Sequence, residues 1–141
     1  MLFRSGNVLV RFDPRLISDG FGLPPRLEEA IFGTGLWSWS DSGLISTEEL
    51  ARLMCGFAGE TDDTDVLTCQ TVLEDFCRFM KPLEPASWLQ DLKAAGKKLY
   101  YLTNYGAAAF EKTVERFSFF RYFDGGVVSS NVRMVKPMPA I

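Results

Sequence analysis

The ten residues 97–106, Lys-Lys-Leu-Tyr-Tyr-Leu-Thr-Asn-Tyr-Gly, decide how this chain folds. Residues 99–102 form a short apolar and aromatic run, which predicts a buried β-strand. The run ends at Thr103 and Asn104, two small side chains that form hydrogen bonds. The residues that follow, 107–117, have the composition and the amphipathic spacing of a helix.

The segment before this strand completes the pattern. Residues 85–95 predict another helix, which ends at Gly96. Alternating helices and strands are typical of an α/β fold with a parallel sheet, and ligands bind such sheets at the carboxyl ends of the strands. Thr103 and Asn104 fall at that end. A plainer interpretation is that Thr103 caps the following helix and Asn104 is a turn residue.

The first half of the chain predicts one strand and then helices. Residues 6–12 have the composition of a strand that leaves a glycine turn. The region 13–81 has no strand signal, and Ser-Thr-Glu-Glu at 46–49 is a capping box that starts a helix. A longer helix is predicted over 65–80, and the acidic residues before it are its expected N-terminal cap.

The end of the chain returns to the α/β pattern. An aromatic run at 119–123 is followed by Asp-Gly-Gly at 124–126, which predicts a turn. Residues 127–129 predict a second short strand that ends in serine. Lys136 and Pro137 follow after a loop.

Composition excludes several classes of function. The 141 residues are about one domain, with a net charge of −3 and no basic patch, so we expect no nucleic-acid partner. No apolar run approaches the ~20 residues of a membrane span, so no membrane partner is expected. The three cysteines form no CxxC pair and predict buried thiols in a reducing, cytoplasmic compartment. The absence of histidine excludes Ser-His and Cys-His catalysis and histidine metal sites.

Four short motifs then agree in chain order. They are Gly-Asn-Val-Leu at 6–9, Leu-Thr-Asn at 102–104, Tyr-Phe-Asp-Gly at 122–125 with Val-Val-Ser at 127–129, and Val-Lys-Pro at 135–137 with Pro139. With a helical region between the first and the second, the sequence resembles the haloacid dehalogenase-like (HAD) hydrolase superfamily. The resemblance is to its branch with a helical cap inserted after the first strand.

The resemblance implies a Rossmann-like parallel sheet core, incomplete in this chain, with an inserted α-helical cap. Residues 1–12 would be the first core strand and the catalytic loop. Residues 13–81 would be the helical cap, and residues 82–141 the remaining α/β core, incomplete at its end.

The resemblance also implies roles for single residues. In this family an aspartate at the end of the first strand attacks a phosphorus or carbon centre. Thr103 and Lys136 match catalytic residues that bind the phosphoryl oxygens and neutralise their charge. Gly6, Asn7 and Asn104 match residues that contact the substrate. Mg²⁺ is the expected cofactor of an intact family member, and we expect this chain to lack its ligands.

The chain departs from the family pattern at both ends. The place of the nucleophile is taken by Arg4, whose side chain stays protonated and does not attack. Gly6 stands where many phosphatases of the family carry a second aspartate, the general acid, although active members with glycine exist. No acidic motif follows Lys136. We therefore expect an inactive fragment that is truncated at both ends.

Three hypotheses about function follow. The leading one is a Mg²⁺-dependent phosphatase that acts on a small phosphorylated metabolite through an aspartyl-phosphate intermediate. The second is a 2-haloacid dehalogenase, which needs no metal. The third is a non-catalytic protein that binds phosphate or another anion at Arg4, Thr103 and Lys136.

Residues of the helical region are expected to select the substrate. The candidates are Phe12, Arg15, Trp37 and Trp39, and the sequence does not rank them. For the two tryptophans we favour a different role, which is to anchor the core of the helical layer.

Overall fold

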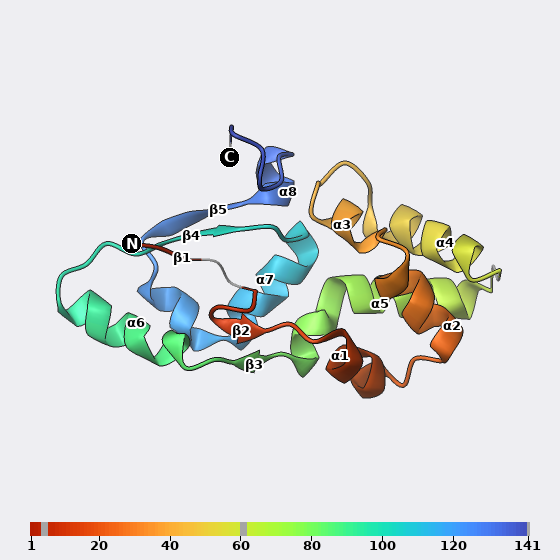
Figure 1. Ribbon diagram of the computed structural model, residues 1–141, viewed down its shortest axis with the longest axis horizontal. Coiled ribbons are helices and arrows are strands. Elements are labelled where there is room, and N and C mark those ends of the chain that lie inside the picture. Colours follow the sequence, from red (N-terminus) through yellow and green to blue (C-terminus); the bar gives the residue numbers. More distant parts are fainter. Residues whose placement is uncertain (4–5, 60–61, 141) are drawn as a thin grey trace.

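A computed structural model describes residues 1–3, 6–59 and 62–140 of the chain. It has a mixed α/β fold with two halves (Figure 1), one built around a parallel sheet and the other from helices. The sheet has the order β1-β4-β5 and consists of Leu2–Phe3, Tyr100–Thr103 and Gly125–Val128. Both pairings are parallel, with Phe3 opposite Tyr101 and Thr103 opposite Val128.

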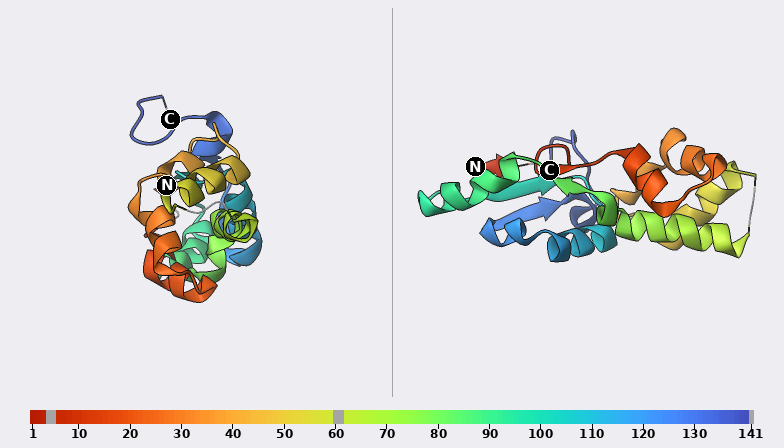
Figure 2. Two further views of the ribbon diagram at one scale, coloured as in Figure 1. Left: turned by 90° about the vertical axis from the view of Figure 1, so that its right-hand side faces the viewer. Right: turned by 90° about the horizontal axis from the view of Figure 1, so that it is seen from below.

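The helical half, which we call the helical block, contains five α-helices and two short irregular helices among the described residues. In chain order these are α1 (Pro14–Phe21), α2 (Pro25–Glu28), η1 (Glu29–Gly33), α3 (Trp37–Ser40), α4 (Thr47–Phe57), α5 (Asp63–Asp75) and η2 (Phe76–Phe79). Figure 2 shows that the block extends from one end of the sheet.

A second, two-stranded sheet lies where the chain enters and leaves the helical block. The strands β2 (Val10–Arg11) and β3 (Lys81–Pro82) pair in antiparallel fashion, with Val10 opposite Pro82. Because the two crossings lie side by side, the block is attached to the sheet half by a double connection.

The sheet half is completed by helices that follow the strands. They are α6 (Pro85–Ala94), α7 (Ala107–Arg116), η3 (Ser118–Tyr122) and α8 (Ser129–Val132). The unit β4-α7-β5 joins two parallel strands through a helix, as the stretch 97–106 predicts. Gly96 ends α6 in the left-handed conformation, at φ 75°.

The predicted capping residues of the helical block are confirmed. The Ser46 hydroxyl accepts from the Glu49 N–H, and the Glu49 carboxylate accepts from the Ser46 N–H, which is a complete capping box. The Asp62 carboxylate accepts from the Thr64 N–H at 2.6 Å and so caps α5. The cysteines are buried and unbridged, as expected.

Three predictions of local structure are wrong. The strand predicted over 6–12 is a turn followed by β2, and the first sheet strand lies earlier, at Leu2–Phe3. Gly125 and Gly126 belong to β5 instead of a turn, because the ring of Tyr101 packs where a side chain on Gly126 would be. Trp39 does not anchor the core, since 54% of it is exposed.

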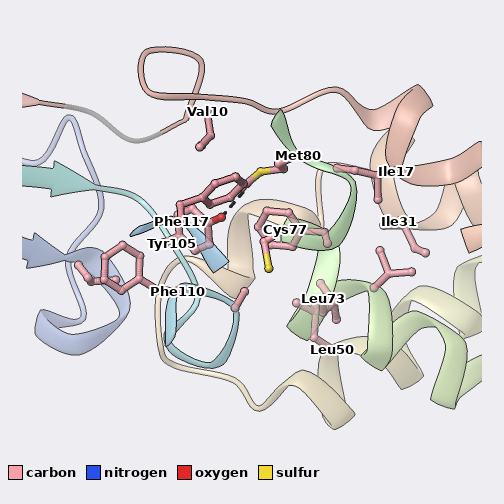
Figure 3. Close-up of a cluster of buried hydrophobic side chains, with 14 of the residues drawn as sticks. Val10, Ile17, Ile31, Leu50, Leu73, Cys77, Met80, Tyr105, Phe110 and Phe117 are labelled. Carbon is pink, nitrogen blue, oxygen red and sulfur yellow. Dashed lines mark hydrogen bonds between the residues drawn. The ribbon is translucent and has the colours of Figure 1, made fainter. Parts of the chain in front are cut away.

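One hydrophobic core runs through both halves (Figure 3). Tyr105 and Phe110 enter it from the sheet half, and Ile31 and Leu73 enter it from the helical block. The Tyr105 hydroxyl lies 2.9 Å from Thr113 Oγ1, so the buried phenol has a hydrogen-bond partner. The continuous core fixes the block against the carboxyl end of β4, where the candidate site lies.

Candidate functional site

Asn104 and Lys136 meet just beyond the carboxyl end of β4. The Asn104 carboxamide accepts from the Lys136 N–H at 2.9 Å and donates to the Lys136 carbonyl at 3.3 Å. The Lys136 ammonium donates to the Leu102 carbonyl at 2.8 Å. The ammonium group of Lys136 is therefore held at the carboxyl end of β4, next to Thr103.

Thr103 is the last residue of β4 and is buried. The interpretation that it caps the following helix is wrong, because Gly106 is the N-cap of α7 and its cap has no side-chain hydrogen bond. The same holds for the interpretation of Asn104 as a plain turn residue, since its carboxamide binds Lys136.

Gly6 and Asn7 lie on a tight loop that also faces this region. Asn7 has φ 55°, its N–H donates to the Val10 carbonyl at 2.7 Å, and its carboxamide oxygen accepts from the Phe12 N–H at 2.9 Å. These bonds close the loop on itself. A Cβ on Gly6 would meet no atom of the described residues within 4 Å, so packing against those residues does not require glycine there.

Three adjoining cavities share Asn104. One of about 580 Å³ is lined by Leu102, Lys136 and neighbouring residues, and one of about 390 Å³ is lined by Lys136, Asp41 and Trp39 among others. The third, of about 170 Å³, is lined by both loop residues and an aromatic wall. Its lining consists of Gly6, Asn7, Phe12, Trp37, Asp41, Phe76, Met80, Asn104 and Tyr105.

Asp41 brings a carboxylate from the helical block into the site. It lines the two smaller cavities. Burial raises its pKa to about 6, against the smaller opposing effects of a hydrogen bond from Ser40 and the charge of Lys136. The charges of Asp41 and Lys136 attract each other, and both residues line the cavity of about 390 Å³.

Ser129 connects this part of the helical block to the sheet. Its hydroxyl accepts from the Tyr105 N–H at 3.0 Å and donates to the Asp41 carbonyl at 2.6 Å. Close packing of backbone supports the same contact, because a Cβ on Gly43 would lie 2.2 Å from the Ser130 carbonyl oxygen. Residues 41–43 are thus held directly on the ends of β4 and β5.

The structure brings together most of the residues predicted from sequence. Asn104 and Lys136 are in contact, Thr103 is their neighbour along the chain, and Gly6 and Asn7 share a cavity with Asn104. Arg4 lies outside the described residues. Of the four candidates in the helical region, Phe12 and Trp37 line the smallest cavity, Trp39 lines another, and Arg15 lines none of these three.

Sequence reasoning missed Asp41 and Ser129. Ser129 carried a signal, since it follows a predicted strand in the same way as Thr103. Asp41 lies among serines and glycines and carried none.

The described residues contain no cluster of metal-binding side chains. In residues 1–3, 6–59 and 62–140 there is no group of three or more His, Cys, Asp or Glu side chains arranged to hold a metal ion. Asp41 is the only carboxylate that lines these three cavities in that part of the chain. None of the described helices is both long and apolar enough to cross a bilayer.

Comparison with known proteins identifies the fold. No family model matches the sequence, and no curated protein matches it significantly. Among solved structures, the HAD-family enzyme BT-2542 of Bacteroides thetaiotaomicron, in complex with magnesium and inorganic phosphate, superposes with a TM-score of 0.70 at 20% identity. The match covers 99% of this chain and 72% of that one.

A second solved structure is the L-2-haloacid dehalogenase of Xanthobacter autotrophicus with chloropropionic acid covalently bound. It superposes with a TM-score of 0.64 at 18% identity, and the match covers 98% of this chain and 59% of that one. The chain therefore has the α/β fold of HAD-family enzymes, and its candidate site lies at the carboxyl edge of the sheet.

Proposed function

We propose that this chain is built as a HAD-type phosphohydrolase and that its site, in the sequence as it stands, binds the phosphoryl group of a small phosphorylated metabolite without hydrolysing it. The observation that carries the proposal is the joint position of Thr103, Asn104 and Lys136 at the carboxyl end of β4. A fixed ammonium, a hydroxyl and a carboxamide at one sheet edge are groups that bind phosphoryl oxygens. The match to a HAD-family enzyme in complex with inorganic phosphate supports the assignment.

Each residue has a distinct role in this proposal. Lys136 neutralises the negative charge of the phosphoryl group, and the Thr103 hydroxyl donates to one of its oxygens. Asn104 acts through Lys136, because it holds the backbone that carries the ammonium. The helical block covers the site and excludes water.

Hydrolysis needs a nucleophile that this sequence does not supply at position 4. The family carries an aspartate there, and this chain has Arg4. We therefore propose that the chain binds the phosphoryl group without turning it over. Magnesium would be the cofactor of an intact family member. The described residues contain no group of three or more His, Cys, Asp or Glu side chains arranged to hold a metal ion, and we assign magnesium no step here.

A dehalogenase is the second candidate, favoured by the match to a structure with chloropropionic acid covalently bound. The two reactions share the carboxylate nucleophile and differ in the atom attacked. Release of halide from 2-chloropropionate without added metal would favour the dehalogenase. A third possibility is a protein that only binds anions. We expect a cytoplasmic protein without a nucleic-acid or membrane partner in each case.

Titration with inorganic phosphate tests the binding site in the chain as it is. We expect Lys136→Met to weaken phosphate binding at least tenfold, since the fixed ammonium is lost. The exposed Lys97→Met is the matched control and should leave the affinity within twofold. Equal affinities of Lys136→Met and the unchanged chain would refute the site.

Restoring the nucleophile tests the activity. The Arg4→Asp variant is assayed with p-nitrophenyl phosphate in the presence of Mg²⁺, and with 2-chloropropionate in its absence. Phosphate release that is lost again in Arg4→Asp with Lys136→Met supports the phosphohydrolase. Halide release alone transfers the assignment to the dehalogenase. If neither product forms while phosphate still binds, anion binding is the remaining function.

A further inference from the structure

The smallest of the three cavities has a composition that phosphate binding does not explain. It has a volume of about 170 Å³ and is walled by Phe12, Trp37, Phe76 and Tyr105, with Asp41 as its charged residue. The rings form a continuous surface, since their centroids are 5.5 Å apart for Phe12 and Trp37, 5.0 Å for Trp37 and Phe76, and 5.3 Å for Phe76 and Tyr105.

The chemistry of this lining selects among possible ligand groups. The Asp41 carboxylate repels an anionic group. A neutral apolar group would remove water from the carboxylate without adding a positive charge in this cavity, which costs free energy. An organic ammonium suits both the carboxylate and the aromatic wall. Its charge pairs with the carboxylate, and its alkyl groups lie on ring faces that attract cations. The volume suits a small head group, since a cavity of about 150 Å³ holds one benzene.

The position of Asp41 fits this role. It lines both the aromatic cavity and the cavity of Lys136, and its charge acts on both Tyr105 and Lys136. The Ser129 hydroxyl holds its backbone carbonyl at 2.6 Å, so the residue is fixed at the sheet edge. Asp41 therefore offers one negative charge between the aromatic wall and the proposed phosphate site.

We propose that the aromatic cavity is an ammonium subsite, and that the phosphorylated ligand of this chain is an aminoalkyl phosphate. Asn104 lines the aromatic cavity and both cavities of Lys136, so the proposed ammonium subsite and the proposed phosphate site adjoin at this residue. This inference rests on the proposed phosphate site for the other end of the ligand.

Binding calorimetry on the unchanged chain tests the subsite with a matched pair of esters. Phosphocholine carries the ammonium, and 3,3-dimethylbutyl phosphate has the same shape without the charge. We expect phosphocholine to bind at least tenfold more tightly, because a desolvated cation gains about that much from rings and a carboxylate. Equal affinities for the two esters would overturn the proposal.

Variants assign the preference to named residues. Asp41→Asn should weaken phosphocholine about tenfold without weakening 3,3-dimethylbutyl phosphate, whereas the exposed Asp19→Asn should change neither. Trp37→Leu should weaken phosphocholine severalfold, and Trp39→Leu, which lies outside the aromatic cavity, should not. Circular dichroism confirms that each variant is folded. An equal loss for both esters in Asp41→Asn would refute the assignment.

Choline alone and inorganic phosphate alone separate the two claims. If choline binds and depends on Asp41 while phosphate does not bind, the phosphate site fails and the ammonium subsite stands. If phosphate binds and the charged and uncharged esters bind equally, the subsite fails alone. If neither ion binds, both claims fail.

Discussion

The carboxamide of Asn104 holds the backbone of Lys136 at both its N–H and its carbonyl, at 2.9 and 3.3 Å. This pair joins the end of β4 to a loop 32 residues further along the chain. The contact matters for function because the loop carries the ammonium that we place at the phosphate. Asn104 is uncharged, but through these two hydrogen bonds it fixes the position of the Lys136 ammonium.

Removing this carboxamide should affect the site more than the fold. We expect Asn104→Ala to weaken inorganic phosphate binding about fivefold to tenfold, because Lys136 loses its fixed position, and to lower the free energy of unfolding by about 1 kcal/mol. Calorimetry and urea denaturation measure the two effects. The exposed Asn131→Ala serves as control. Unchanged phosphate affinity in Asn104→Ala would show that the hydrogen bonds between Asn104 and Lys136 do not contribute to phosphate binding.

Structural features that depend on neighbouring residues could be predicted from the sequence, and contacts between residues far apart in the chain could not. The strand β4, its polar end and the capping box of α4 depend on neighbouring residues, and each could be predicted from a few letters. The contacts of Lys136 with Asn104 and of Asp41 with Ser129 span 32 and 88 residues. The motifs at 102–104 and 135–137 predict Asn104 and Lys136 as site residues. The contacts themselves were not predicted, because they use backbone groups that every residue has.

Short strands were missed for a different reason. The strands β1 and β3 each contain two residues, which is too few to show the alternation that identifies a strand. The strand β2, also of two residues, lies within the longer strand predicted over 6–12. Gly126 shows the opposite error, since a glycine typical of turns is needed inside β5, where the Tyr101 ring takes the space of a side chain.

Gly43 provides a test of how closely the helical block touches the sheet. It has φ 67°, and an added Cβ would lie 2.2 Å from the Ser130 carbonyl oxygen. Gly59 has φ 76°, and no atom of the described residues lies within 4 Å of the same position. Gly59→Ala should cost about 1–2 kcal/mol for the left-handed backbone alone. Gly43→Ala should cost at least about 2 kcal/mol more, as overpacking adds to it. Equal costs in urea denaturation would contradict the tight contact.

Asp124 should make the fold sensitive to acid. Its carboxylate accepts from the Lys93 ammonium at 2.5 Å and from the Leu99 N–H at 2.9 Å, and these bonds lower its pKa to about 2. The ionised form is favoured in the folded state, so its contribution to stability is complete above about pH 4 and is lost as the pH falls toward 2.

Unfolding of Asp124→Asn between pH 2 and 7 measures this contribution. The variant should be less stable than the unchanged chain at pH 7, and the difference should shrink below pH 4. The exposed Asp91→Asn in α6 is the matched control. A difference that stays constant with pH would show that the carboxylate acts by shape and not by charge.

Asp41 should show the opposite pH dependence. Its pKa is raised to about 6 by burial, so the folded state binds its proton more tightly than the unfolded state does. Its contribution therefore decreases as the pH rises from about 4 to about 6, by at most about 3 kcal/mol. The groups that oppose this effect are the Ser40 hydroxyl and the Lys136 ammonium.

The variant Asp41→Asn tests both the pH dependence of stability and the proposed ammonium subsite. At pH 7 it should unfold at a higher urea concentration than the unchanged chain, because a buried charge is removed, and the gain should vanish below about pH 4. The same variant should bind phosphocholine about tenfold more weakly. A residue kept at a cost in stability is typical of a binding site, where function and stability oppose each other. If Asp41→Asn is instead less stable at pH 7, Asp41 is a structural partner of Lys136.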